Sequence, residues 1–522
     1  MKKQAGYGMR YVFGGQLDAP KQLEFDVLVI GAGLAGLYAS LHIDPSLSCC
    51  VLTKERLEVS NSWLAQGGIA AAVSDEDTPE EHLKDTLEAG AGLCNLEAVQ
   101  ALVEEGPLDV LTLNKMGVPF DLDADGNFGL AKEGGHSKRR VLHAGGDKTG
   151  RETVKALFSL AEMHQHIQFY ERAFLVDVLL TDENKLWGAL VHMQGAYHMI
   201  KTQVLMIASG GVGQVYRTST NPDTATGDGI AAAVRAGVLV QDMEFVQFHP
   251  TGFWEKDTTG QAFLISETLR GEGAILRNHK KEAFMDGKHP RKDLAPRDIV
   301  ARAIWKEMQE ACTEYAYLDI CHKERAYLET RFPTIFAHCL EQGIDMSEDF
   351  IPICPVQHYL IGGIKTDLMG RTNVDGIYAF GEAALTGVHG ANRLAANSLL
   401  ECLVFARRAA KCVNEQLVGA EKEGEISDFV PAFATRAERK FDTEQLRKRL
   451  QNLMTQNCAV VRSEMGLQSA LLELEEMERV LIDGFEDSRL YIELCNLLQV
   501  AKEIIRAALQ RTESVGAHYR ED

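Results

Sequence analysis

The stretch Phe25–Ser40 constrains the fold of this chain more than any other. A run of apolar, mostly β-branched residues meets the glycine pattern G-x-G-x-x-G, and an apolar helical pattern follows. This order predicts a strand, a tight turn and a helix N-terminus. Gly31 permits the turn, Gly33 lets a pyrophosphate approach the backbone, and Gly36 lets the helix pack on the strand. The pattern predicts a dinucleotide site, and a purely structural glycine turn is the alternative.

The ends of neighbouring elements extend this prediction. The backbone N–H groups of Leu34 and Ala35, at the start of the helix, are free to meet phosphates. The second strand ends at Thr53, where dinucleotide folds usually place an acid for the adenosine ribose. Lys54 follows it and fits either a contact with pyrophosphate or adenosine, or a solvated strand end.

Two polar segments suit a ring system with a polyol chain. Ser60–Ala71 combines small residues, hydroxyls and a glycine pair, which favours a loop pressed against a planar ring, although an ordinary turn is the alternative. Asp228 opens a short Ala-rich helix, where it accepts from ribose or ribityl hydroxyls or caps the helix. The loop residues expected to contact the cofactor are Asn61, Ser62, Ala65, Gln66, Gly67 and Gly68.

A second strand-and-helix unit decides which dinucleotide is expected. An apolar strand ends at Glu382, and a helix begins near Ser398 and Leu399 after a polar loop. A flavin needs such an acid for its ribityl hydroxyls and such a helix N-terminus at its N1–O2 edge, whereas a nicotinamide does not. The chain is therefore expected to bind a flavin.

Charge, cysteines and hydropathy exclude several classes of protein. The chain of 522 residues has a net charge of −21, which argues against a nucleic-acid partner and requires a locally positive pocket for any anionic substrate. Its 11 cysteines include no C-x-x-C pair, so no metal site is expected. No run approaches the roughly 20 apolar residues of a membrane helix. We expect a cytoplasmic protein with reduced thiols.

The pattern along the chain predicts an α/β protein, with a Rossmann-like FAD-binding domain, an inserted α+β capping domain and a C-terminal helical bundle domain. The expected order is an N-terminal tail (1–24), the FAD-binding domain (25–245), the capping domain (246–354), the rest of the FAD-binding domain (355–426) and the helical domain (427–522). Apolar residues at helical spacing are expected in the core of the bundle: Met465, Leu467, Leu471, Leu472, Leu474, Met477, Leu481, Leu490, Leu494, Leu497, Leu498 and Ile504.

A set of motifs in fixed order resembles the flavoproteins of the succinate dehydrogenase and fumarate reductase superfamily. These are GAGLAG from Gly31, AQGGI from Ala65, FHPTG from Phe248, RGEG from Arg270, PRD from Pro296, HY at His358 and HGANRLAANSLLE from His389. Within the superfamily, the segment EGGHSKRRVLH from Glu133 is most similar to the L-aspartate oxidase family. The likeness runs from about residue 25 to the end.

The resemblance implies non-covalent FAD, because Asn61 stands where the dehydrogenases carry a flavin-linked histidine. It also implies oxidation of L-aspartate to iminoaspartate, O₂ or fumarate as electron acceptor, a place in NAD synthesis and delivery of the imine to quinolinate synthase. A dicarboxylate needs at least two cationic anchors, and arginine suits two-pronged carboxylate binding. The expected anchors are Arg297, Arg393, His249 and His358, each of which also fits a structural ion pair.

The amino group of aspartate calls for an acceptor that succinate does not need. Glu133 is the expected acceptor, assisted by Ser266 and Glu267. Arg297, by resemblance, handles a proton or stabilises charge during turnover. Three positions depart from the family pattern, namely Ser266, Ala396 and Val515. The rival functions are a soluble fumarate reductase, the flavoprotein subunit of a succinate-oxidising complex, and a flavin protein without turnover.

Overall fold

The computed structural model describes residues 9–17, 20–256, 260–420 and 431–522. Its central sheet is parallel through five strands in the order β6-β2-β1-β9-β18. The apolar run at Val27–Ile30 is buried within β1, as its composition predicts. The strands are β1 (Lys21–Ile30), β2 (Cys49–Thr53), β6 (Ile167–Glu171), β9 (Ala196–Ile207) and β18 (Ile377–Ala379). Cys49 and Cys50 are buried and free in β2, as expected.

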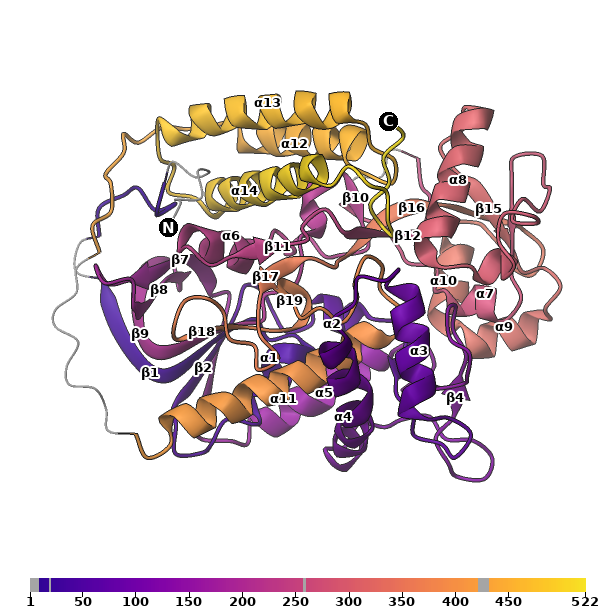
Figure 1. Cartoon of the computed structure of the whole chain (residues 1–522), viewed down its shortest axis with the longest axis horizontal. Coiled ribbons are helices and arrows are strands. Elements are labelled where there is room, and N and C mark those ends of the chain that lie inside the picture. Colours follow the sequence, from indigo (N-terminus) through magenta and orange to yellow (C-terminus); the bar gives the residue numbers. More distant parts are fainter. Residues whose placement is uncertain (1–8, 18–19, 257–259, 421–430) are drawn as a thin grey trace.

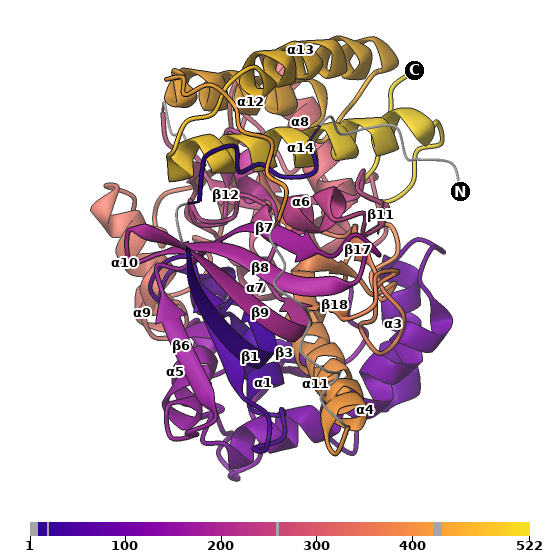
Figure 2. The ribbon, with the colours of Figure 1, turned by 90° about the vertical axis from the view of Figure 1, so that its left-hand side faces the viewer.

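Strand β9 pairs with two different strands along one of its edges. Its first half pairs antiparallel with β8 (Leu186–Met193), which pairs in turn with β7 (Phe174–Leu180). Its last residues, Leu205–Ile207, pair with β18 instead. Figure 2 shows the antiparallel strands leaving the parallel part of the sheet. Because β9 is long, it belongs both to an antiparallel layer and to the parallel sheet.

Helices cover one face of the parallel strands. Helix α11, at the centre of this layer, packs against α1 and α4, and the three share a buried apolar cluster with the strands. The helices of this face are α1 (Leu34–Ser40), α4 (Leu96–Lys115), α5 (Thr149–Ala161) and α11 (Asn397–Leu417). Two small elements, α2 (Asn61–Leu64) and α3 (Pro79–Ala89), lie on the same side (Figure 1).

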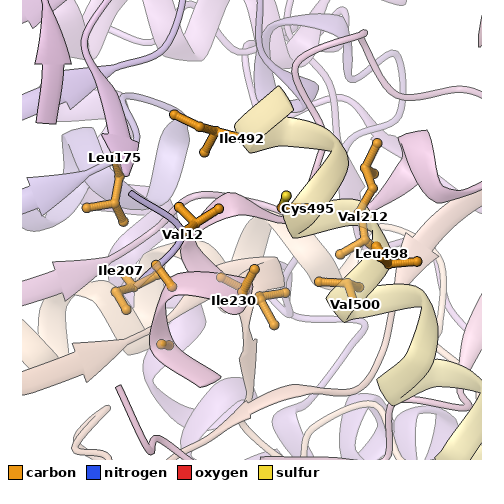
Figure 3. Close-up of a cluster of buried hydrophobic side chains, with 14 of the residues drawn as sticks. Val12, Leu175, Ile207, Val212, Ile230, Ile492, Cys495, Leu498 and Val500 are labelled. Carbon is orange, nitrogen blue, oxygen red and sulfur yellow. The ribbon is translucent and has the colours of Figure 1, made fainter. Parts of the chain in front are cut away.

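On the opposite side, α6 (Asp228–Arg235) packs against β7, and the C-terminal helix α14 (Arg489–Gln510) packs against α6. The helices α12 (Thr443–Asn457) and α13 (Glu464–Ile482) pack against α14. Figure 3 shows Val500 of α14 beside Ile230 of α6, in a buried cluster that also contains Ile492 and Leu498 of α14. Serine and aspartate side chains cap these helices, at Asp442, Ser463 and Ser488. The helical domain is thus fixed onto the sheet by an apolar layer.

Most of the predicted bundle residues are buried, but three predictions are wrong. Met465, Leu472 and Leu490 are 80%, 64% and 48% exposed. Leu467 and Leu474 of α13 are fully buried, and Met465 and Leu472 each lie two residues before them. Two residues turn a helix by about 200°, so the exposed pair faces away from the bundle.

A second sheet forms the cap, seen on the right of Figure 1 with its helices. Its order is β13-β10-β16-β15-β14, with β12 paired to β16. The strands are β10 (Thr218–Ser219), β12 (Val246–Phe253), β13 (Gly260–Gln261), β14 (Ile275–Arg277), β15 (Ala316–Asp319) and β16 (Ile351–Leu360). The helices are α7 (Thr268–Gly271), α8 (Arg297–Ala311), α9 (Arg325–Arg331) and α10 (Pro333–Glu341). An apolar cluster that includes Leu318 and Phe332 fills the space between them.

The cap sheet extends beyond the capping range 246–354. Strand β10 contributes from before residue 246, and β16 continues to Leu360. The domain limits remain predictions, and the limit at 426/427 lies outside the described residues. None of the described helices combines the length and the apolar character that crossing a bilayer requires.

Short elements complete the described fold. One small sheet joins β3 (Ile69–Ala70), β5 (Val141–Leu142) and β4 (Leu130–Ala131), and another joins β11 (Val240–Gln241), β17 (Gly363–Lys365) and β19 (Ala384–Leu385). Within the described ranges, single turns of 3₁₀ helix are η1 (Gly213–Val215), η2 (Lys292–Leu294) and η3 (Gly381–Ala383).

Candidate active site

The described residues enclose a cavity of about 710 Å³ beyond the carboxyl ends of β1, β9 and β18. Ligands of open α/β sheets bind at this edge. All seven predicted catalytic residues line the cavity. All predicted cofactor residues line it too, except Leu34 and Gly36. Residues taken from distant parts of the sequence therefore converge on one space.

Leu34 and Gly36 lie behind the cavity wall. The N–H of Leu34 donates to Ser62 Oγ at 3.0 Å. A Cβ on Gly36 would lie 1.9 Å from the carbonyl oxygen of Gly31, so only glycine allows this close packing. Gly31 has a φ of +112°, which side chains rarely adopt. The predicted roles of Gly31 in the turn and of Gly36 in close helix packing are confirmed. The expectation that the N–H of Leu34 is free is wrong, because Ser62 accepts from it. A cofactor contact by Leu34 or Gly36 stays a prediction.

Lys54 and Asp228 form one ionic cluster at the cavity wall. Lys54 Nζ lies 2.7 Å from Asp228 Oδ2 and 2.6 Å from Glu493 Oε1, and Asn496 donates to Asp228 Oδ1 at 2.8 Å. The N-cap of α6 is Gly227, and no side-chain bond caps this helix. The alternative role of Asp228 as a helix cap is therefore wrong.

Glu382 and Asn61 meet in the middle of the cavity. Glu382 accepts from the N–H of Leu360 at 3.0 Å and from Asn61 Nδ2 at 3.2 Å. Burial raises the pKa of Glu382 to about 7, against the opposite effect of these donors. A large fraction of this carboxyl group is therefore protonated near neutral pH, and the group can donate hydrogen bonds to hydroxyl groups or accept them.

The two predicted arginine anchors share one acceptor. Gln247 Oε1 accepts from Arg297 Nη1 at 3.1 Å and from Arg393 Nε at 3.3 Å. Arg393 also donates to Ser398 Oγ at 2.6 Å, and its guanidinium carbon lies 4.3 Å from the ring centre of Tyr359. Burial lowers the pKa of Arg393 to about 10, so the group remains cationic at neutral pH. Two guanidinium groups are therefore held side by side.

Glu267 is already engaged by two cations. Its Oε2 lies 2.6 Å from Arg297 Nε, and its Oε1 lies 3.3 Å from Arg270 Nη2. Burial disfavours the ionised form, but the two arginines outweigh it and lower the pKa of Glu267 to about 2. Glu267 is thus a fixed carboxylate that orients Arg297, and its predicted help to a substrate amine stays a prediction.

His249 and His358 are neutral neighbours, with ring centres 5.0 Å apart. Burial lowers both pKa values well below the ordinary value of histidine, and nearby arginines lower them further. The N–H of Thr251 donates to His249 Nδ1 at 3.2 Å, which assigns the ring proton of the neutral form to Nε2. His358 Nδ1 lies 2.8 Å from Thr220 Oγ1. Both rings can therefore offer hydrogen bonds without adding charge.

Glu133 also lines the cavity, on the turn between β4 and β5. Thr268 Oγ1 donates to Glu133 Oε1 at 3.3 Å, and His143 Nε2 lies 3.8 Å from the same oxygen. Although burial opposes it, His143 lowers the pKa of Glu133. Ser266 Oγ lies 3.0 Å from Thr268 Oγ1 and joins this group. An ionised carboxylate is thus set into a pocket that also holds two arginines.

Sequence reasoning assigned no role to three residues of this arrangement, although Arg270 and Tyr359 belong to the RGEG and HY motifs. A role for Gln247 could have been predicted from strand alternation, because it lies two residues before His249 on β12. The contact between Arg270 and Glu267 could have been predicted from helical spacing, because Arg270 lies three residues after Glu267. Tyr359 follows His358 directly, but its stacking on Arg393 leaves no trace in the sequence.

Family comparisons agree with the two principal parts of the fold. Residues 26–399 match the family described as FAD binding domain, and residues 447–522 match the family described as fumarate reductase flavoprotein C-term. The cofactor of this chain is FAD.

The cavity fits a flavin dinucleotide on grounds of its own. Among the described residues, Ser209 Oγ, Gln66 Oε1 and Asn221 Oδ1 are buried without a hydrogen-bond partner, and all three residues line the cavity. The backbone of Gly33 and Gly210 is open to the same space. Unpaired polar side-chain atoms and glycine backbone without side chains in the cavity wall can bind a ligand with ribityl hydroxyls and phosphates.

Curated relatives span nearly the whole chain. The L-aspartate oxidase of Streptomyces coelicolor is 43% identical, over 98% of this chain and 91% of that protein. L-aspartate oxidase 1 of Ralstonia nicotianae is 41% identical, over 96% of each chain. The L-aspartate oxidase of Neisseria meningitidis serogroup B is 40% identical, over 96% of this chain and all of that protein.

Solved structures share the fold at lower identity. E. coli quinol fumarate reductase FrdA superposes with a TM-score of 0.89 at 30% identity, covering 96% of this chain and 92% of that one. Mycobacterium smegmatis Sdh1 gives a TM-score of 0.83 at 32% identity, covering 96% and 89%. With this fold, this cavity and relatives matched almost from end to end, the chain belongs to the L-aspartate oxidase family, within the flavoprotein superfamily of succinate dehydrogenase and fumarate reductase.

Proposed function

We propose that this protein oxidises L-aspartate to iminoaspartate, with O₂ or fumarate as the final electron acceptor, as the first step of NAD synthesis. One observation carries the proposal. Two buried arginines, joined by Gln247, lie in the same cavity as the ionised Glu133. A dicarboxylate that also bears an ammonium group matches these charges.

The arginines and histidines bind the two carboxylates of the substrate. Arg393 and Arg297 supply the charge, and the planar guanidinium suits two-pronged carboxylate binding. His249 and His358, being neutral, donate hydrogen bonds. The chain is strongly acidic, so these buried cations are the local attraction that a dianionic substrate requires.

The substrate ammonium binds Glu133, with Ser266 and Thr268 close by. A buried carboxylate attracts a cation strongly because little water screens the pair. Bound FAD supplies the acceptor for the hydride that leaves the substrate Cα after the substrate nitrogen has released a proton, because only a neutral amine has the lone pair that forms the imine bond. Arg297 stabilises charge during this step, oriented by Glu267, because a guanidinium hardly releases its proton. The cap encloses the substrate and keeps water from it.

The same scaffold suits the rival function, oxidation of succinate or reduction of fumarate without amine chemistry. Glu133 speaks against that rival, because a carboxylate facing a dicarboxylate site repels a substrate that has no cation. Asn61 also speaks against a covalent flavin, because its amide cannot form the histidyl bond. On this basis we propose that the predicted site residues have the roles described above. We also propose that the five sequence ranges expected from the sequence, from the N-terminal tail to the helical domain, are the domains of this protein.

The decisive experiment mixes the purified yellow protein with L-aspartate, D-aspartate or succinate without oxygen. L-aspartate is expected to bleach the flavin absorbance, while the other two leave it oxidised. Peroxide should form once air is admitted. Bleaching by succinate alone, or no bleaching by L-aspartate, would overturn the proposal.

The product suggests a partner and a location. Iminoaspartate hydrolyses readily in water, so a consumer close at hand preserves it. We propose that quinolinate synthase receives it in the cytoplasm. Co-purification of the two proteins, or faster quinolinate formation when both are present together than in sequential incubations, would support this partner.

A further inference from the structure

The turn that carries Glu133 is anchored at its C-terminal end by side chains of the segment 77–85. Glu133 faces the cavity, and the N–H of His136 donates back to the carbonyl oxygen of Glu133 at 3.3 Å, which closes the turn. The contacts that anchor this turn come next along the chain, at Ser137 and Arg140, and they are made with α3 and the residues before it. Figure 1 shows α3 beside β4, from which the turn departs.

Asp85 of α3 is the common acceptor of the turn. Its Oδ2 accepts from the N–H of Ser137 at 2.7 Å, from Ser137 Oγ at 2.8 Å and from Arg140 Nη1 at 2.5 Å. Arg140 is fully buried and also binds Asp77, through Nε at 2.7 Å and Nη2 at 2.8 Å. A buried cation between two carboxylates holds its place firmly, because removing one partner leaves a charge uncompensated.

The two glycines that follow Glu133 pack closely against neighbouring residues. A Cβ on Gly134 would lie 1.9 Å from Glu267 Oε1, and one on Gly135 would lie 2.6 Å from Leu394 Cδ1. His136 Nε2 lies 2.9 Å from the carbonyl oxygen of Ala395. The glycines therefore sit directly against the site wall, so a shift of the turn at Ser137 is transmitted to Glu133.

We propose that Asp85 is a positioning residue for selectivity between amino and plain dicarboxylates. It holds the turn so that the carboxylate of Glu133 reaches the substrate ammonium, and it touches neither substrate nor cofactor. Other contacts fix the arginines that hold the carboxylates, chiefly Gln247 and Glu267. Losing Asp85 therefore weakens binding of L-aspartate without weakening binding of succinate, which is L-aspartate without the amino group. This inference rests on the proposed function.

The test compares Asp85→Asn with the wild-type holoenzyme in one assay, which gives the KM for L-aspartate and the inhibition constant for succinate. We expect the KM to rise about tenfold and the inhibition constant to change less than about twofold, since only the ammonium contact is lost. Equal changes in both constants, or no change, would overturn the inference. A wild-type enzyme that does not oxidise L-aspartate would instead refute the proposed function.

Two further variants separate positioning from general damage. Asp109→Asn is the matched control, because Asp109 is a buried carboxylate on the neighbouring α4 that binds Arg407 and Tyr38 away from the cavity. It should leave the ratio of the two constants unchanged. If Asp85→Asn does not fold, Ser137→Ala removes one bond of the same clamp and should shift the ratio in the same direction by about twofold.

A double variant tests whether Asp85 acts through Glu133. Glu133→Gln removes the carboxylate itself and should raise the KM for L-aspartate at least as much as Asp85→Asn. If positioning is the mechanism, Asp85→Asn combined with Glu133→Gln has the same KM as Glu133→Gln alone. Fully multiplied effects would show that Asp85 acts by another route and would overturn the inference.

Discussion

The side-chain oxygen of Gln247 lies 3.1 Å from Nη1 of Arg297. The same oxygen binds Arg393, so a neutral acceptor lies between two cations that would otherwise repel each other. Because this acceptor is neutral, it orients both guanidinium groups without adding a second carboxylate beside Glu267, which already binds Arg297.

Replacing Gln247 with Leu should raise the KM for L-aspartate by about tenfold to a hundredfold, since both arginines lose an oriented contact. FAD content, measured from the absorbance ratio of flavin to protein, should stay unchanged. Gln247→Glu should weaken binding further by adding a charge that competes with the substrate. A normal KM in both variants would contradict this account.

Arg297→Leu should abolish turnover, with a loss of about a thousandfold or more, because the group that stabilises charge over the substrate is missing. FAD should stay bound, since Arg297 belongs to the cap and is held by Glu267. Stopped-flow measurement of flavin bleaching by L-aspartate checks this step directly. A bleaching rate near that of the wild type would remove Arg297 from the mechanism.

Glu382 makes the stability of the FAD-free protein depend on pH. Its pKa in the folded chain is about 7, above the ordinary value of 4.5, so the folded state binds the proton more tightly than the unfolded state. Stability present below pH 4.5 is therefore lost as the pH rises to about 7, by about 3 kcal/mol for this group. Urea unfolding of the apoprotein at several pH values measures it, and Glu382→Gln should flatten that part of the profile.

The flavin should leave the protein on denaturation. Asn61 binds Glu382 through its amide and has no nucleophilic ring nitrogen with which to attach a flavin. Precipitation with acid should give a yellow supernatant and a colourless pellet, as separated by centrifugation and read by absorbance. A pellet that kept its fluorescence would reveal a covalent bond at some other residue.

Gly36→Ala should destabilise the protein by several kcal/mol and release FAD, because the new Cβ would collide with the backbone of Gly31 at 1.9 Å. Gly466→Ala on α13 is the control, since its Cβ would meet only side-chain atoms, the nearest at 3.0 Å. Thermal unfolding should show a large drop in Tm for the first variant and a change of at most a few degrees for the second.

Local patterns were sufficient wherever one stretch of sequence contains the whole signal. The turn at Gly31, the buried strand β2 and the Ala-rich helix after Gly227 follow from spacing and composition alone. The catalytic candidates also line one cavity, because family motifs name residues whatever their distance along the chain.

The missing parts depend on contacts between distant segments. Strand β10 has only two residues, so no periodicity marks it, yet it extends the cap sheet. Asp85 binds Ser137 and Arg140 across more than fifty residues, and each of the three looks like an ordinary charged or polar surface residue in the sequence. Helical spacing placed Met465 in the core because periodicity alone does not say where an apolar stripe ends.

The two-neighbour pairing of β9 has a consequence for biosynthesis. On the ribosome, β9 is made before the cap, whereas β18 is made after it. Until β18 arrives, the end of β9 at Leu205–Ile207 has unpaired backbone groups on that edge, which other chains can join. A slowly translated or misfolded cap would lengthen that exposure, so we expect cap mutations to reduce yield through aggregation of nascent chains even where the finished enzyme tolerates them.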